Sequence, residues 1–249
     1  MNKNKQSSLS QKLKTSKTWE NLISLVFPRE LYCICCGKIL TEKKLLSLCD
    51  HCFAHLGWND SEPQYTKGLK LSYCLDYHIY SRTLIFDFKY RKKLHLLKHI
   101  GLIMVNKYWE DQLSYHVLVP VPMHKSKEHR RGFNQARLMA EEMSKELGIP
   151  VVDCLVRTRE TRTMRGLGPY EREANISGSI ELKPSMQKLI EGKDVLIIDD
   201  FFTTGATAKA CSDVLIKSGH VRNVAALTFA SKKSENVDEV DGVNASEQI

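Results

Sequence analysis

Long apolar runs are missing from this sequence of 249 residues. No stretch approaches the roughly 20 consecutive apolar residues that a membrane-spanning helix needs, so we expect no membrane span. The lysines of the N-terminal segment, from Lys3 to Lys17, have no apolar block behind them, and a secretory signal requires one. We therefore expect a cytoplasmic protein.

Internal repeats are also missing, as is the GxxxxGKS or GxxxxGKT pattern of a Walker-type phosphate loop. The apolar fraction of 42% is ordinary for a globular protein and excludes wholesale disorder. The chain has 37 lysine and arginine residues but only 29 acidic residues. The resulting charge of +8 favours anionic partners such as phosphorylated metabolites or nucleic acid. Solvated surface lysines explain this balance equally well.

Composition divides the chain into four parts. Residues 1–18 predict a disordered basic arm, and residues 234–249 predict a disordered acidic tail, because neither holds enough apolar side chains to form a core. Residues 19–70 contain the paired cysteines. Residues 71–233 form the main domain, in which short apolar strand patterns alternate with helical periodicity.

This alternation predicts the fold class of the main domain. Strand patterns cover residues 71–80, 116–121, 195–199 and 221–230, and helical patterns cover residues 82–112, 134–147 and 207–218. We expect the first helix to be broken or loosened near Gly101. Strands and helices in this order predict an α/β fold, with a parallel sheet covered by helices on both faces.

Eight cysteines in a chain without a secretory signal indicate a metal site rather than disulfides. Cys33 and Cys36 form one CxxC pair, and Cys49 and Cys52 form a second pair twelve residues later. Four thiolates suit a tetrahedral zinc ion and leave no open position, so the predicted zinc is structural. Cys35 competes with Cys36 in this assignment, and four unligated thiols in a packed hairpin are the alternative.

The segment VLIIDDFFTTGATA is typical of a phosphate-binding loop. An apolar strand delivers the adjacent carboxylates of Asp199 and Asp200, and a helix begins after the turn. Free N–H groups and the positive end of that helix point into the turn, where they bind an anion. A threonine-rich helix cap is the alternative. The residues predicted to cradle the phosphate are Thr203, Thr204, Gly205, Ala206 and Thr207.

With the cysteine pairs and this loop, the sequence resembles the ComF family. Three further stretches fit that family, namely VPVP at residues 119–122, RRGFNQA at residues 130–136, and the spaced Arg172 and Asn175. The resemblance runs from about Cys33 to Ala230. It implies a type I phosphoribosyltransferase-like domain with a small N-terminal four-cysteine zinc ribbon.

The resemblance also implies a ligand, phosphoribosyl pyrophosphate, bound together with Mg²⁺. Asp199 and Asp200 would then be the catalytic pair that fixes the ribose hydroxyls. Arg131 would bind the pyrophosphate, and Lys89 would contact the ligand. Two positions depart from the family pattern: Met164 stands where a glutamine is expected, and Phe201 replaces a small aliphatic residue, a change we attribute to packing.

For function, the family implies DNA uptake during natural transformation, with single-stranded DNA and a helicase as partners. The alternative is an active phosphoribosyltransferase with an unidentified acceptor. The arginine-rich residues 156–179 predict a mobile loop, which would either close over the ligand or follow a nucleic-acid backbone. Candidates for stacking on bases are the aromatic residues Trp58, Tyr65, Tyr73, Tyr77 and Tyr80, although most such residues simply belong to the core.

Overall fold

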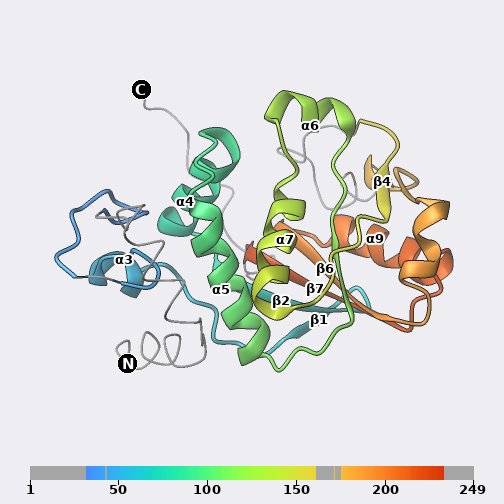
Figure 1. Cartoon of the computed structure of the whole chain (residues 1–249), viewed down its shortest axis with the longest axis horizontal. Helices are drawn as coiled ribbons and strands as arrows, with labels where there is room; N and C mark the ends of the chain where they lie inside the picture. The colour runs from blue at the N-terminus through green and yellow to red at the C-terminus, as the bar shows by residue number, and fades with distance from the viewer. Residues whose placement is uncertain (1–31, 43, 161–170, 172–174, 233–249) are drawn as a thin grey trace.

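A five-stranded sheet forms the centre of the computed structural model (Figure 1), which describes residues 32–42, 44–160, 171 and 175–232. The strand order is β1-β2-β7-β6-β3. Four strands run parallel to one another, and β1 pairs antiparallel with β2 at one edge. The strands are β1 (Gln64–Thr66), β2 (Leu69–Asp76), β3 (Val117–Pro120), β6 (Asp194–Phe202) and β7 (Asn223–Ser231).

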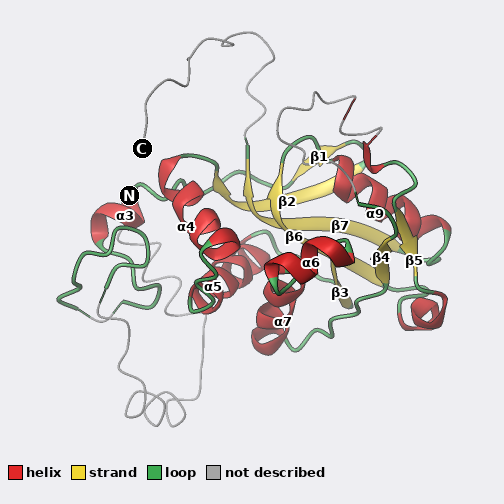
Figure 2. Ribbon diagram, turned by 90° about the horizontal axis from the view of Figure 1, so that it is seen from above, coloured by secondary structure: helices red, strands yellow, loops and turns green. Residues whose placement is uncertain are grey.

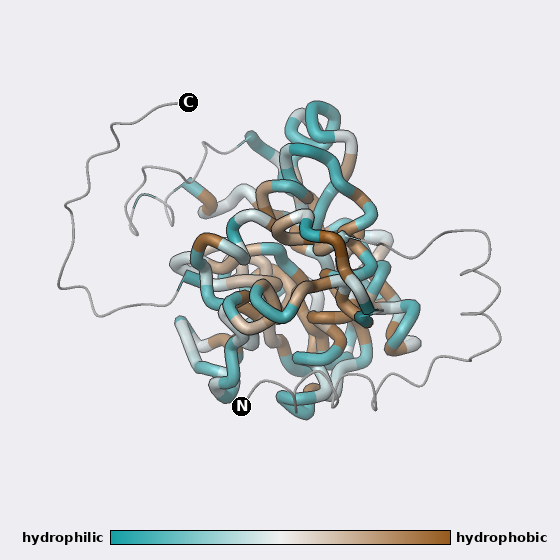
Figure 3. Tube along the Cα trace, turned by 90° about the vertical axis from the view of Figure 1, so that its left-hand side faces the viewer, coloured by the Kyte–Doolittle hydropathy of each residue, from teal (hydrophilic) through white to brown (hydrophobic). Residues whose placement is uncertain are grey.

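Apolar side chains leave both faces of the sheet, so each face needs its own cover. Along β6, Leu196 and Ile198 belong to one core cluster, whereas Val195 and Ile197 belong to the other, as the two-residue period of a strand requires. Complete burial of each such side chain contributes about 1.5–3 kcal/mol. Figure 3 shows the hydrophobic segments gathered in the middle of the molecule.

Helices supply that cover on both faces (Figure 2). The first face packs against α4, α5 and α7, and the second packs against α9 and the small antiparallel pair β4 and β5. The predicted parallel sheet with helices on both faces is therefore confirmed. The covering elements are α4 (Ile79–Tyr90), α5 (Leu96–Glu110), α7 (Gln135–Leu147), α9 (Ala206–Lys217), β4 (Leu155–Arg157) and β5 (Ile180–Leu182).

The predicted helix 82–112 is interrupted, but Gly101 is not the reason. The chain leaves the helical path between α4 and α5, where the buried Asp87 accepts hydrogen bonds from Arg91 at 3.1 Å and Lys93 at 2.6 Å. Gly101 lies inside the continuous α5. A Cβ there would meet the Cγ of Glu142 at 2.5 Å, so this glycine serves the close approach of α7 instead.

Two predicted strand boundaries also move. The pattern over residues 71–80 ends as a strand at Asp76, because His78 caps α4 and its side chain accepts from the backbone N–H of Tyr80. By contrast, β6 continues to Phe202 and pairs Asp199 with Thr228 of β7. Both carboxylates therefore project from a hydrogen-bonded strand whose geometry the sheet determines.

Helix α7 has a capping residue at each end. Asn134 accepts from the N–H of Ala136 at 3.1 Å, and Gly148 ends the helix in the left-handed conformation. Three short helices were not predicted: α3 (Asp50–Ala54), α6 (Lys125–Arg131) and the 3₁₀ helix η1 (Pro184–Leu189).

Within the described part of the chain, no helix combines the length and apolar character needed to cross a bilayer. The predicted basic arm (1–18) and the predicted acidic tail (234–249) lie outside the described residues.

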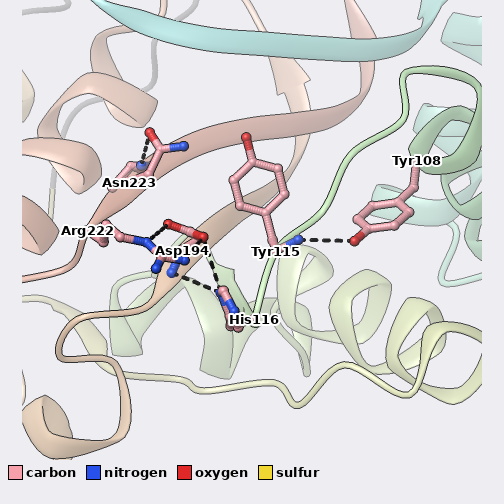
Figure 4. A network of polar contacts seen from close by, with 7 residues as sticks. Tyr108, Tyr115, His116, Asp194, Arg222 and Asn223 are labelled. Carbon is pink, nitrogen blue, oxygen red and sulfur yellow. Dashed lines mark hydrogen bonds and ion pairs between the residues drawn. The ribbon is translucent and has the colours of Figure 1, made fainter.

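A polar network joins the strand starts at the edge opposite the phosphate loop (Figure 4). Asp194 begins β6, and its carboxylate accepts from Arg222, with Nε at 2.7 Å from Oδ1, and lies 3.3 Å from Nδ1 of His116. The hydrogen bonds from Arg222 lower the pKa of Asp194. Nearby, the hydroxyl of Tyr108 accepts from the N–H of Tyr115 at 3.2 Å. These contacts hold the starts of β3, β6 and β7 together.

Candidate functional site

The loop between β6 and α9 encloses a hollow. Its lining consists of Asp199 and the continuous run 201–208, so all five predicted phosphate-loop residues lie around one space. Helix α9 begins at Ala206, and no side chain caps its first turn. The N–H groups at this helix start are thus available to an anion, and the helix dipole adds positive potential.

Gly205 occupies the turn in a conformation that favours glycine, with φ at +75°. A Cβ at this position would lie 2.6 Å from Cζ of Phe202. The Phe202 ring therefore fills the space that a side chain at this position would need. The glycine is required because the loop turns tightly over that ring.

The two carboxylates have different surroundings. Asp200 forms an ion pair with Lys89 of α4, whose Nζ lies 2.8 Å from Oδ2, and both side chains are largely buried (12% and 18% exposed). Asp199 accepts from the N–H of Asp200 at 2.8 Å. Burial and the charge of Asp200 raise the pKa of Asp199 to about 7, although that N–H, Lys89 and Arg157 oppose the shift. Near neutral pH, Asp199 can therefore gain or lose a proton.

The end of α4 joins the carboxylates to α6. Lys89 reaches Asp200, and the next residue, Tyr90, lies under the guanidinium of Arg131, with Cζ 5.5 Å from the ring centroid. Phe88 packs on Phe133 at 5.7 Å between ring centroids. The structure therefore brings Lys89 and Asp200 together, and it places Arg131 against Tyr90, the residue that follows Lys89.

Phe201 has an aromatic partner that the sequence did not indicate. Its ring centroid lies 4.6 Å from that of Tyr77, which accounts for the large side chain in terms of packing, as expected. Tyr77 follows β2, and its N–H donates to Ser231 at the end of β7. The contact depends on the strand order, which places β7 between β2 and β6, so no local sequence signal could have identified it.

The arginine-rich segment lies only partly within the described residues. Arg157 belongs to β4, and its Nε and Nη2 are buried without a hydrogen-bond partner among the described residues. Burial lowers the pKa of Arg157, while Asp199 opposes that shift. Arg159 donates to the carbonyl of Ser177 at 2.5 Å. Arg162, Met164, Arg165 and Arg172 fall outside the described part of the chain.

A second candidate site is the cysteine cluster. The sulfur atoms of Cys33, Cys36, Cys49 and Cys52 all lie within 4.8 Å of one another. Sulfurs around a tetrahedral zinc ion lie about 3.8 Å apart, since each is about 2.3 Å from the metal, and Cys36 Sγ lies 3.7 Å from Cys49 Sγ. The four predicted cysteines form a group that can hold a metal ion.

Cys35 lies beside this cluster but is not one of its four members. Its sulfur lies 3.9 Å from the carbonyl oxygen of Tyr80, and burial raises its pKa to about 11, although a hydrogen bond with the side chain of Cys52 opposes that shift. Burial also opposes ionisation of Cys33, but the backbone N–H groups of Cys36, Cys49 and Cys35 outweigh it and lower the pKa of Cys33 to about 7. The predicted competition between Cys35 and Cys36 thus favours Cys36.

The aromatic residues predicted to stack on bases do not act as a set. Tyr73 is only 3% exposed and belongs to the core, which is the alternative given for these residues. Trp58 is half-buried and donates to the carbonyl of Phe53 at 2.7 Å. Tyr80 contacts His51 through its hydroxyl at 2.9 Å. Tyr65 on β1 and Tyr77 remain exposed (80% and 40%).

Comparison with known proteins identifies one matching domain family and several similar proteins. Residues 134–246 match the phosphoribosyl transferase domain family. Adenine phosphoribosyltransferase is a solved structure with a TM-score of 0.38 and 14% identity, over 57% of this chain and 74% of that one. The solved structure of the phosphoribosylpyrophosphate amidotransferase of Bacillus subtilis has a TM-score of 0.36 and 20% identity, over 53% of this chain and 25% of that one. The sheet order, the phosphate loop and the family match define a phosphoribosyltransferase-type domain.

Curated relatives narrow this class. Competence protein F of Haemophilus influenzae is 35% identical over 41% of this chain and 44% of that protein. Competence protein ComFC of Bacillus subtilis is 29% identical over 47% of this chain and 45% of that protein. DNA utilization protein YhgH of Escherichia coli is 31% identical over 41% of this chain and 44% of that protein. The chain spans a little under half the length of the curated relatives it matches. Together with the domain match and the cysteine cluster, these similarities support the resemblance to the ComF family.

The cysteine cluster leads to a metal-content prediction. We expect protein purified without chelator to carry about one zinc ion per chain, and Cys36→Ser to lose most of it because a ligand is removed. Cys35→Ser is the matched control, since its sulfur lies beside Tyr80, and it should retain the metal. Elemental analysis of both variants measures this. Equal zinc loss in both variants would contradict the assignment of Cys36.

The raised pKa of Asp199 leads to a pH prediction. Folding raises this pKa, so its stabilising contribution is present below about pH 4, the unfolded value, and is lost as the pH rises through about 7. Asp199→Asn removes the titration and keeps an acceptor for the N–H of Asp200. The free energy of unfolding of the variant, relative to the natural protein, should rise by about 2 kcal/mol between pH 4 and pH 8.

Denaturant unfolding at several pH values measures this difference. The expected change of about 2 kcal/mol in the free energy of unfolding is smaller than the roughly 4 kcal/mol that the full pKa difference would give, because Asp199 keeps some solvent contact. A difference between the two proteins that stays constant across this pH range would show that Asp199 does not titrate there.

Proposed function

We propose that the main domain binds phosphoribosyl pyrophosphate. The observation that carries this proposal is the hollow lined by Asp199 and residues 201–208 at the uncapped start of α9. There the N–H groups and hydroxyls of Thr203, Thr204 and Thr207 face the 5-phosphate. An anion at a helix start with adjacent carboxylates suits a phosphorylated ribose, because its hydroxyls need acceptors next to the phosphate.

In this proposal each carboxylate has a distinct part. Asp199 and Asp200 accept hydrogen bonds from the ribose hydroxyls, and Lys89 balances the charge of Asp200. Arg131 lies on α6 beside Tyr90 and binds the pyrophosphate. Mg²⁺ is held mainly by the pyrophosphate oxygens and water rather than by protein ligands.

We further propose that the four-cysteine cluster holds a structural zinc ion. Cys33 and Cys52 are buried in the core cluster that also contains residues of α4 and α5. Metal binding would therefore stabilise the packing of residues 32–58 against the main domain. The division into a zinc-ribbon region over residues 19–70 and a main domain over residues 71–233 stays a proposal, and β1 and the first residues of β2, although they precede residue 71, pair within the main sheet.

The biological role that we propose is DNA uptake in the cytoplasm of a naturally transformable cell, with single-stranded DNA and a helicase as partners. The names of two relatives, Competence protein F and ComFC, support this role, as does the name DNA utilization protein for a third. The charge of +8 supports an anionic polymer as partner.

Titration calorimetry with Mg²⁺ and phosphoribosyl pyrophosphate tests the ligand proposal. Asp200→Asn should weaken binding by about 10- to 100-fold, as expected for a lost hydrogen bond to a charged group. Gly205→Ala should weaken it to a similar degree, because a Cβ would displace Phe202 and distort the loop.

Gly148→Ala is the matched control for Gly205→Ala. Gly148 has the same positive φ, but no atom lies within 4 Å of an added Cβ, so this change should lower stability by about 1 kcal/mol and leave ligand affinity unchanged. If Asp200→Asn and Gly205→Ala both bind as the natural protein does, the ligand site lies elsewhere.

A second function is favoured by one observation. The pKa of Asp199 near 7 suits a group that exchanges protons during catalysis, so an active phosphoribosyltransferase is the alternative to a binding protein. Release of pyrophosphate in the presence of nucleobase or amine acceptors, abolished in Asp199→Asn, would support the enzyme. Binding without release across such a panel would support the non-catalytic role.

A further inference from the structure

The exposed face of α4 carries two aromatic rings in contact. Phe86 is 46% exposed and Tyr90 is 63% exposed, and their ring centroids lie 5.0 Å apart. Large aromatic side chains that lie side by side at the surface indicate a binding function. Neither ring belongs to the lining of the phosphate hollow.

A guanidinium lies over each of these rings. Cζ of Arg91 is 5.7 Å from the centroid of Phe86, and Cζ of Arg131, which reaches across from α6, is 5.5 Å from the centroid of Tyr90. Lys92 also belongs to this group, because its side chain lies beside Gly132 at the end of α6. The Nζ of Lys92 would be 3.9 Å from a Cβ added to Gly132. These five residues, Phe86, Tyr90, Arg91, Lys92 and Arg131, form what we call the α4–α6 surface.

The charge around this surface is mostly positive. No acidic residue occurs between Phe88 and Trp109, a stretch that contains six lysine and arginine residues. The nearby Asp87 is buried and accepts from Arg91 and Lys93, so its carboxylate is turned inward. On α6, Glu128 is the one acid among four basic residues.

We propose that the α4–α6 surface binds single-stranded nucleic acid, a proposal that rests on the DNA-handling role given above. Phosphates alone need only cations, whereas exposed rings interleaved with planar guanidinium groups also offer stacking faces to bases. Base faces are accessible in a single strand and hidden in a duplex. The occupant that matches both the charge and the rings is therefore an unpaired strand.

The position of this surface relates it to the ligand site. Lys89 turns inward to Asp200, while its neighbours Tyr90 and Arg91 belong to the surface. Figure 1 shows α4 and α6 at the same end of the molecule. The strand would thus cross the rim of the phosphoribosyl pyrophosphate site rather than occupy it.

Fluorescence anisotropy with a labelled oligothymidylate of about 20 nucleotides, long enough to exceed one single-strand site, and with a duplex of equal length tests this proposal. Phe86→Ala should weaken single-strand binding about 5-fold or more, because a stacked base is lost, whereas Phe86→Trp should bind as the natural protein does. Arg91→Ala should weaken binding and reduce the salt slope by about 0.7, and Asp87 keeps Lys93 as its partner in that variant.

Matched controls lie at distant positions. Trp109→Ala removes an aromatic ring of similar exposure (49%) at the far end of α5, and Arg222→Ala removes an arginine that pairs with Asp194 at the opposite edge of the sheet. Both should bind the oligonucleotide within twofold of the natural protein. Thermal unfolding and calorimetry with phosphoribosyl pyrophosphate should show that Phe86→Ala remains folded and retains its ligand.

The outcomes separate this proposal from the function on which it rests. If the natural protein binds the oligonucleotide but Phe86→Ala and Arg91→Ala bind equally well, the surface is wrong and the DNA-handling role stands. If the natural protein binds duplex as tightly as single strand, stacking on unpaired bases is excluded. If it binds neither, both the surface and direct DNA handling are excluded, while the ligand site is judged by calorimetry alone.

Discussion

The ion pair between Lys89 and Asp200 connects the parts of this molecule that matter for function. Strand β6 is buried on both faces and delivers two adjacent carboxylates into a site with little solvent. Two charges so close repel each other, and a low-dielectric environment strengthens that repulsion. The lysine from α4 balances one carboxylate, and a raised pKa allows the other to be neutral. The placement of α4, and of everything attached to it, follows from this requirement.

The cysteine cluster also contributes to the placement of α4, because the two pack together in the core. Its buried residues share a core cluster with Leu84 and Phe88 of α4 and with Leu96 and Ile100 of α5. A metal site of this kind fixes the short segments that carry the ligands, which could not form a core alone. The cluster and the ligand site therefore lie at two ends of one packed unit, with α4 between them.

Much of this arrangement could be predicted from sequence, because its signals are local. The apolar strands, the caps of α7 at Asn134 and Gly148, the two CxxC pairs and the phosphate loop each depend on neighbouring residues. The interruption between α4 and α5 was misplaced because Gly101 signals a break locally, whereas it serves packing against Glu142. The contacts of Tyr77 with Phe201, and of Arg131 with Tyr90, depend on strand order and helix packing, which no local pattern contains.

The borders of the sheet restrict how other molecules can attach. One edge strand of the sheet is β1, which has only three residues. The other edge strand is β3, and its outer side is covered because Leu118 exchanges backbone hydrogen bonds with Pro150 and Val152. Short or covered borders offer little main-chain template for an incoming strand. Association through extension of the sheet is thus disfavoured, and recognition falls to side chains on the helices and loops.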